Sequence, residues 1–132
     1  MANWGPGIYE NDDAMDWIYD LLDSGGLSRV KQALDVVIQE DVDGLELADC
    51  HIALAAADLV ASLDGEINPN LPTEAEDWIT LTNRPVSGLR AKAELVVKKI
   101  VNESFIPDQF DDVDQRSQWH GEMKSLLERL EI

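Results

Sequence analysis

The sequence predicts an all-α fold, a compact single-domain bundle of about six helices over residues 1–132. Apolar residues recur at i, i+3, i+4 and i+7 through most of the chain. No segment alternates apolar and polar residues as a half-buried strand does. A chain of 132 residues, 45% of them hydrophobic, is also long enough to bury one ordinary core.

Residues 1–10 are expected to form a non-helical segment that caps one end of the bundle, and two amphipathic helices follow it. The first helix should end at Gly25-Gly26, because adjacent glycines disfavour a helix. Ser28 is a candidate N-cap for the second. The predicted inner faces consist of Ala14, Trp17, Ile18, Leu21 and Leu22 in the first helix and of Val30, Ala33, Leu34, Val37 and Ile38 in the second.

The third helix, over about residues 45–63, is apolar on nearly every side. Such a helix is typically central, with neighbours on more than one face. Its alanines would let those neighbours approach closely, and Gly65 is expected to end it.

Three further helices are predicted after a loop at residues 68–72. Thr73 begins the fourth with a capping box, and Pro85 ends it. Ser87 is a candidate cap for the fifth, and the sixth should run from about Val113 to the end of the sequence. The predicted buried residues are Trp78 and Ile79 in the fourth helix, Leu89, Ala93, Val96, Val97 and Ile100 in the fifth, and Trp119, Met123, Leu126, Leu127 and Leu130 in the sixth.

The charge is strongly acidic, with 27 acidic and 10 basic residues and a formal net charge of −17. It is also uneven, because residues 1–66 contain 15 acidic and 2 basic residues, against 12 and 8 in residues 67–132. Such a surface repels nucleic acid and anionic membranes. The acidic charge either attracts a basic protein partner or serves only to keep the protein soluble.

A cytoplasmic location is expected. Cys50 is the only cysteine, so no disulfide within the chain can form and a reducing compartment is favoured. The sequence does not begin with the basic and apolar segments of a secretory signal. Its longest apolar runs are far too short to span a bilayer.

Four aspartates, Asp13, Asp16, Asp20 and Asp23, follow helical spacing opposite the apolar stripe of the first predicted helix. They form a line of negative charge about 15 Å long at the helical rise. This acidic stripe is either a solvated face or a docking surface for a basic protein.

Asp58 lies on an otherwise apolar side of the third helix, so its carboxylate must be paired, hydrogen-bonded or neutral. Arg84, Arg90 or Lys92 could pair with it, or it could make a polar contact in a ligand pocket. His51 shares that side, but about 10.5 Å along the helix axis is too far for a direct bond. If the pair is buried, Asp58→Asn should cost about 2–4 kcal/mol.

No metal or cofactor is expected. An EF-hand register with Gly44 at its sixth position puts Cys50 where a bidentate glutamate is needed. Cys50 and His51 are adjacent, so on a helix they point about 100° apart and rarely share a zinc ion. Cys50 is expected to be a small core-edge residue and no nucleophile.

We predict a structural role for each unusual residue of the opening stretch, residues 3–17. Asn11 is placed to cap the first helix, and Asp12 lies in the first turn, where the helix dipole favours a carboxylate. Gly5 and Gly7 suit a tight entry into the helix. The complete set of residues in this motif is Trp4, Gly5, Gly7, Tyr9, Asn11, Asp12 and Trp17.

The order Trp4-Gly5-Pro6-Gly7, Tyr9, Asn11-Asp12, Ala14 and Asp16-Trp17 resembles the N-terminal signature of a bacterial family, domain of unknown function 4259. Residues 53–58, 78–79 and 98–101 also fit that family, while the similarity is weaker after Asn102. The resemblance implies no particular activity, catalytic residue or cofactor.

The expected function is a non-enzymatic protein-binding or regulatory module of the inhibitor type, whose acidic first half engages a basic protein. The alternative is a small-ligand-binding domain or carboxylate-dependent enzyme that uses Asp58, Asp12 and Asp13. An enzyme should join these carboxylates in a concave pocket, whereas a binding module should show a convex acidic face.

Overall fold

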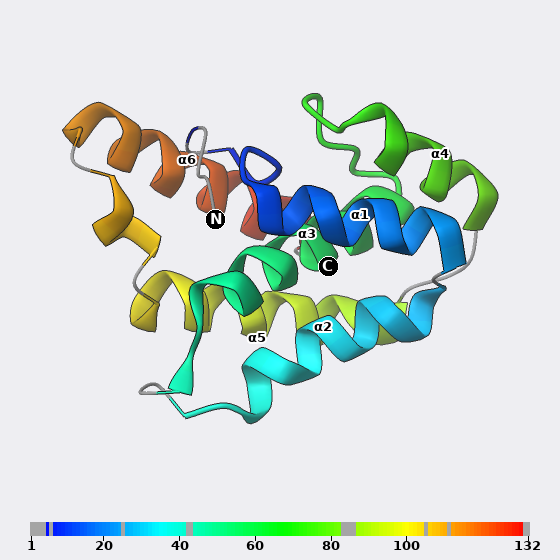
Figure 1. The fold of residues 1–132 in the computed structure, drawn as a ribbon, viewed down its shortest axis with the longest axis horizontal. Coiled ribbons are helices and arrows are strands. Elements are labelled where there is room, and N and C mark those ends of the chain that lie inside the picture. Colours follow the sequence, from blue (N-terminus) through cyan, green and yellow to red (C-terminus); the bar gives the residue numbers. More distant parts are fainter. Residues whose placement is uncertain are drawn as a thin grey trace.

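The structure is a computed structural model that describes residues 5, 7–24, 26–41, 44–82, 87–104, 106–110 and 112–130. Within these ranges it contains six α-helices, one short 3₁₀ helix and no strand, which confirms the all-α prediction (Figure 1). The elements are α1 (Asp12–Ser24), α2 (Leu27–Gln39), α3 (Leu47–Leu63), α4 (Thr73–Thr82), α5 (Ser87–Glu103), η2 (Ile106–Gln109) and α6 (Val113–Leu130).

The central position predicted for the third helix is confirmed. Helices α1, α2, α4, α5 and α6 all pack against α3, which runs through the middle of the bundle (Figure 1). Every residue from Ala53 to Ser62 is buried. The side chains of Ala53, Ala55, Ala56, Ala57 and Ala61 are fully inaccessible, which is consistent with close approach of neighbouring helices on several sides.

The outer helices bury the faces that their apolar spacing predicts. In α1 and α2, the half-buried Leu22 and Ile38 lie at the edges of these faces. In α5 and α6, Leu89 and Leu127 have the same edge position. The fully packed residues are Ala14, Trp17, Ile18 and Leu21 in α1, Val30, Ala33, Leu34 and Val37 in α2, Ala93, Val96, Val97 and Ile100 in α5, and Trp119, Met123, Leu126 and Leu130 in α6.

The start of α2 differs from the prediction. Gly26, in an extended conformation, is the N-cap, and no side-chain hydrogen bond caps the helix. The Gly26 carbonyl accepts a hydrogen bond from the Arg29 backbone N–H at 2.9 Å, so Ser28 lies inside the first turn and is not the cap. Glycine is an acceptable N-cap residue, which lets the helix begin earlier than Ser28 would require.

The end of α3 is a Schellman turn built on Gly65. Gly65 has a φ of 102°, a conformation that residues with a Cβ rarely adopt. Its backbone N–H donates to the Ser62 carbonyl, and the N–H of Glu66 donates to the Ala61 carbonyl, both at 3.1 Å. The turn directs residues 66–72 back along the bundle toward the start of α4.

None of the helices in the described ranges combines the length and the apolar character needed to cross a bilayer.

Candidate functional site

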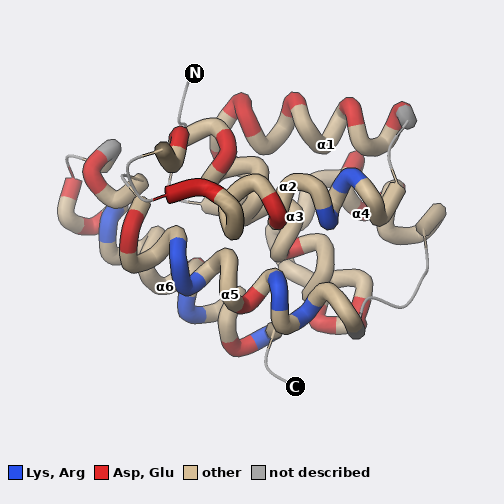
Figure 2. Tube along the Cα trace, turned by 90° about the horizontal axis from the view of Figure 1, so that it is seen from below, with Lys and Arg blue, Asp and Glu red and all other residues tan. Residues whose placement is uncertain are grey.

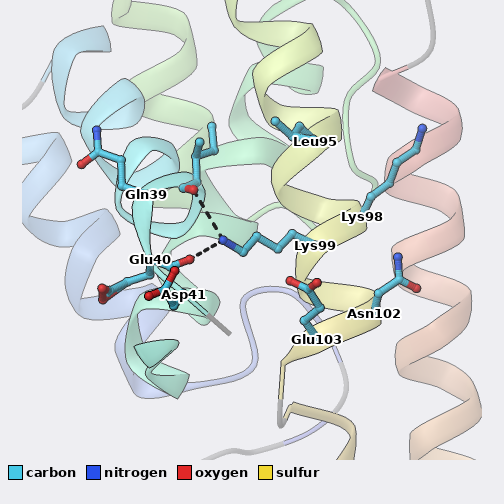
Figure 3. A pocket seen from close by; sticks show the side chains of 9 residues that line it. Gln39, Glu40, Asp41, Leu95, Lys98, Lys99, Asn102 and Glu103 are labelled. Atoms are coloured by element: carbon cyan, nitrogen blue, oxygen red, sulfur yellow. Dashed lines mark hydrogen bonds between the residues drawn. The ribbon is translucent and has the colours of Figure 1, made fainter. Parts of the chain in front are cut away.

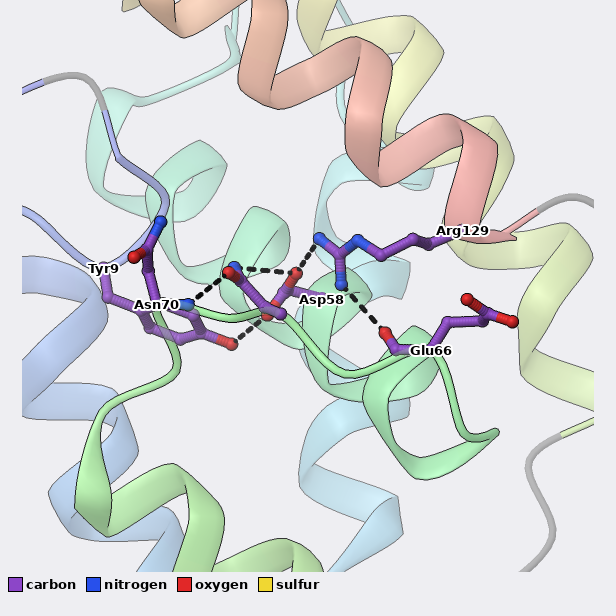
Figure 4. Close-up of polar contacts among 6 residues, drawn as sticks. Tyr9, Asp58, Glu66, Asn70 and Arg129 are labelled. Carbon is purple, nitrogen blue, oxygen red and sulfur yellow. Dashed lines mark hydrogen bonds and ion pairs between the residues drawn. The ribbon is translucent and has the colours of Figure 1, made fainter.

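Asp58 lies at the centre of a buried polar network formed by side chains from distant parts of the chain (Figure 4). Its side chain is completely inaccessible to solvent. The Tyr9 hydroxyl donates to Oδ2 at 2.6 Å, and Asn68 Nδ2 donates to Oδ1 at 3.3 Å. The Arg129 guanidinium pairs with Oδ1. Both carboxylate oxygens are therefore occupied by donors.

Each donor is held in place by local structure. Asn68 follows the Gly65 turn, and its Oδ1 accepts the backbone N–H of Asn70 at 2.8 Å, which fixes the direction of its amide. Arg129 lies in the last turn of α6 and also donates from Nη1 to the Glu66 carbonyl at 3.1 Å (Figure 4). The network thus ties α6 both to α3 and to the loop after it.

Tyr9 remains a hydrogen-bond donor at all ordinary pH values. Burial raises the pKa of its hydroxyl well above the usual value, and the negative charge and hydrogen bond of Asp58 raise it further, against a smaller opposing effect of Arg129. Tyr9 therefore binds Asp58 as a neutral phenol.

The structure pairs Asp58 with Arg129, a cation that was not among the three predicted partners. Arg90 pairs with Asp64 and donates to the last backbone carbonyls of α6, while Lys92 pairs with Asp35 at 2.5 Å. Arg84 lies outside the described residues. Arg129 is the partner because the packing of α6 on α3 brings it to Asp58 from 71 residues away.

His51, the other residue assigned to this side of α3, is buried at 6% exposure, seven residues before Asp58. Asp12 and Asp13 are half-buried in the first turn of α1. Neither of these aspartates lines the cavity beside Tyr9 that is described next. A role for His51 in a pocket stays a prediction.

This cavity, of about 380 Å³, lies beside the network. Tyr9 and Asn68 belong to both, so they stand between the cavity and Asp58. The described residues that line it are Gly7, Ile8, Tyr9, Glu10, Asn68, Asn70 and Glu122.

Sequence reasoning missed the polar residues of this cavity and also Arg129. The sequence predicts Asn68 and Asn70 only as loop residues, since an Asn-Pro-Asn sequence is typical of a turn. Glu122 and Arg129 are two helical turns apart on α6, so they lie close to one face. That spacing was the available signal, and nothing local distinguishes it from two separately solvated charges on one helix face.

The pKa of Glu122 depends on its burial and on the charged groups around the cavity. Burial raises the pKa of its carboxyl group, and the negative charges of Asp58 and Glu10 raise it further, while Arg129 lowers it. The positive charge of Arg129 therefore does not cancel the carboxylates around it. The described charged side chains that line the cavity, Glu10 and Glu122, are both carboxylates.

The opening motif builds one wall of this cavity. Asn11 caps α1 as predicted, with its Oδ1 accepting the Ala14 backbone N–H at 2.8 Å. The Gly7 N–H donates to Glu10 Oε1 at 3.0 Å, so the Glu10 side chain folds back over the glycines. A Cβ at Gly5 would lie 2.7 Å from Glu10 Oε2, and one at Gly7 would collide with Oε1. Trp4 lies outside the described residues.

The acidic stripe lies on the outer face of α1. Asp16, Asp20 and Asp23 are exposed and Asp13 is half-buried, while the opposite face of the helix is in the core. The helix carries five aspartates and no Lys or Arg in its 13 residues. Figure 2 shows acidic residues spaced along α1, with most of the described Lys and Arg on α5 and α6 and the others on α2.

Most of the cations on α5 and α6 make contacts within the molecule. Besides Arg90, Lys92 and Arg129, Lys98 pairs with Glu94 at 2.9 Å. Lys99 caps the end of α2 by donating to the Val37 carbonyl at 2.8 Å and to neighbouring carbonyls (Figure 3). It crosses an open hollow of about 550 Å³ between α2 and α5.

Cys50 is buried, and burial raises the pKa of its thiol to about 11. The nearby Asp49 charge adds to this rise, so the thiol stays protonated and is a poor nucleophile at neutral pH. Across the described ranges, no three His, Cys, Asp or Glu side chains converge in a way that could hold a metal ion.

Comparison with known proteins identifies a family for this chain but does not indicate an activity. The chain matches no curated protein and no solved structure. The model of a family described as a domain of unknown function, DUF4259, matches residues 2–122. This match covers most of the chain, including the opening motif, the Asp58 network except Arg129, and the cavity. The chain therefore belongs to the DUF4259 family.

Proposed function

We propose that this protein is a non-enzymatic binding module whose acidic stripe, Asp13, Asp16, Asp20 and Asp23, docks a basic protein. The observation that carries the proposal is the contrast between α1 and the other helices. The stripe faces outward from a helix without a basic residue, whereas most of the cations of α5 and α6 are engaged within the molecule. Such docking would suit a regulatory role of the inhibitor type.

The physical basis is long-range attraction. A line of like charges about 15 Å long creates a negative potential that accelerates encounter with a basic surface. The charges are exposed, so added salt should weaken the attraction strongly once the Debye length falls from about 10 Å at 0.1 M to about 3 Å at 1 M.

The alternative, an enzyme that uses Asp58 as its working carboxylate, has less support. Asp58 is completely inaccessible, and Tyr9 and Asn68 stand between it and the cavity, so a substrate in the cavity does not reach its carboxylate. The cavity beside Asp58 is better suited to holding a ligand than to transforming one.

The test is affinity capture from a lysate of the source organism, in low and in high salt, followed by titration of each purified partner. The test variant carries Asp16→Lys, Asp20→Lys and Asp23→Lys. A matched variant carries Asp77→Lys, Glu103→Lys and Glu128→Lys, three exposed acidic residues on α4, α5 and α6. Both variants change the net charge by the same amount.

The proposal requires a basic protein that binds the wild type and the matched variant, is lost by the stripe variant and is released by salt. Equal binding to both variants would mean that only net charge matters. Retention of every partner by the stripe variant would make the stripe a solvated face.

A further inference from the structure

The cavity beside Tyr9 is bounded by three parts of the fold that the sequence keeps apart. Residues 7–10 form one wall, the loop at residues 68–70 forms another, and Glu122 of α6 closes the third side. At about 380 Å³ it lies at the small end of the range for ligand pockets. It can hold a small molecule or one long side chain, but not a nucleotide-sized ligand.

The walls are rigid where they meet the core. Tyr9 and Ile8 are buried, and the Tyr9 hydroxyl is fixed by Asp58. Both ends of the Asn68 amide are engaged, one by Asp58 and the other by the Asn70 backbone. A ligand would therefore meet a preformed surface, which lowers the entropic cost of binding.

Among the described residues, the charged groups that line the cavity are all acidic. None of the described residues that line it is Lys, Arg or His, whereas Glu10 and Glu122 supply two carboxylates. The Glu122 carboxylate makes no hydrogen bond or ion pair with another described residue. The Arg129 cation nearby is already engaged by Asp58 and by the Glu66 carbonyl.

We propose that this cavity binds an organic cation, a primary ammonium or guanidinium group on a short aliphatic chain. The carboxylates of Glu122 and Glu10 are the counter-charges, the Asn70 amide is an additional polar contact, and Ile8 and the Tyr9 ring form the wall for the aliphatic part. A divalent metal ion is a poorer fit, because no three acidic or other ligating side chains converge in the described ranges.

The electrostatics of the site support this ligand class independently. Burial and the charges of Asp58 and Glu10 raise the pKa of Glu122, and the opposing charge of Arg129 compensates an ionised carboxylate there only in part. A bound cation would complete that compensation. An anionic ligand would meet the same field as repulsion.

The cation could be a free amine or the Lys or Arg side chain of a protein partner. The two sources present the same charged group to the cavity and differ only in whether the far end of the aliphatic chain is free or joined to a peptide backbone. The inference does not depend on the acidic stripe, because the lining residues of the cavity include none of the four stripe aspartates.

The experiment is an NMR titration of the full chain, with backbone amide shifts as the readout. The probes are butylammonium and methylguanidinium, for a free cation, and N-acetyl-lysine amide and N-acetyl-arginine amide, for a protein side chain. Butanol and sodium chloride are the controls for apolar contact and for ionic strength.

The expected result is saturable binding in the millimolar range, with the largest shifts at residues 7–10, 68–70 and 122. Glu122→Gln should weaken it about tenfold or more, because the substitution removes the negative charge that strengthens the hydrogen bond to the cation. Glu128→Gln, an exposed charge on the same helix, should leave it unchanged. Tighter binding of a capped amino acid than of the free cations would identify a partner side chain as the source.

The proposal is overturned if none of the four cations gives saturable shifts at these residues. It is also overturned if Glu122→Gln and Glu128→Gln weaken binding equally, since the effect would then be one of net charge. Neither result bears on the acidic stripe, and the triple Lys variant of α1 should bind the small cations as the wild type does.

Discussion

Helix α1 carries five aspartates in 13 residues and leaves three of them exposed, whereas α3 places one aspartate, Asp58, in the middle of the core. On α1, Asp16, Asp20 and Asp23 are exposed, and their spacing follows the outer face of the helix. On α3 the carboxylate has lost its water entirely, and three other side chains replace it.

This difference shows that the energetic cost of a carboxylate depends on whether it is exposed or buried. Like charges on an exposed helix face cost only tenths of a kcal/mol per pair. A buried carboxylate without partners would cost several kcal/mol, so the fold must bring donors to it. We therefore expect substitutions of the exposed aspartates to change stability little and substitutions of Asp58 to change it strongly.

The comparison is tested most severely by making the same substitution in both helices. Asp58→Ala leaves Arg129 without its counter-charge and should lower the free energy of unfolding by about 3–5 kcal/mol. Asp16→Ala, on the exposed face of α1, should change it by no more than about 0.5 kcal/mol. Urea denaturation followed by circular dichroism measures both, and similar values for the two variants would contradict the comparison.

The tyrosines offer a second matched pair with a smaller effect. Tyr9→Phe removes a buried hydrogen bond to a charged acceptor and should cost about 1.5–3 kcal/mol. Tyr19→Phe, at a side chain that is 51% exposed, should be nearly neutral. The same denaturation experiment applies. A neutral Tyr9→Phe would mean that Tyr9 contributes little to holding the Asp58 charge.

The acidic stripe should show the opposite sign and a dependence on salt. Asp16→Lys replaces repulsion along α1 with attraction to neighbouring aspartates, so it should stabilise the fold by tenths of a kcal/mol up to about 1 kcal/mol at low ionic strength. The gain should disappear near 1 M salt, where the Debye length is about 3 Å. The denaturation midpoint at the two salt concentrations measures it, and a gain independent of salt would point to packing or helix propensity.

The smallest expected effect is the pH dependence of stability that arises from Glu122. Its pKa is raised in the fold by burial, Asp58 and Glu10, against Arg129, while Tyr9 faces the same cavity as a neutral phenol. The folded state therefore holds the Glu122 proton more tightly than the unfolded state, and its contribution to stability falls as pH rises through the raised pKa.

Glu122→Gln removes this dependence. The variant should gain stability relative to the wild type as pH is raised from about 4 toward 7, measured as the difference in denaturation midpoints. Glu128→Gln, at an exposed position on α6, is the control and should show no such trend. A difference that is constant with pH, or that has the reverse sign, would show that the cavity does not disfavour the Glu122 charge.

The features that the sequence predicted are the local ones. The six helices and the central place of α3 depend on spacing within a few turns, and that spacing is visible in the chain. The start of α2 was misplaced because Gly26 and Ser28 are both acceptable caps, and only the backbone decides between them. The helix η2 was missed because four residues are too few to show a period.

For the Asp58 site too, the local features could be predicted from the sequence and the tertiary ones could not. An aspartate on an apolar helix face predicts that a partner exists, because an unpaired buried charge is too costly. Its identity depends on how α6 crosses α3, and no local pattern distinguishes Arg129 from the other cations. The cavity was also beyond prediction, because its walls come from a turn, a loop and a distant helix.

The distances along the chain within the Asp58 network constrain the order in which the protein can fold. Tyr9 and Arg129 lie 49 and 71 residues from Asp58 in opposite directions. During synthesis from the N-terminus, α3 leaves the ribosome well before α6 exists. Until Arg129 is made, Asp58 lacks its counter-charge, which disfavours full burial of the central helix on a nascent chain. Helix α6 therefore completes the core, and the six described helices should fold as one cooperative unit once α6 has been made.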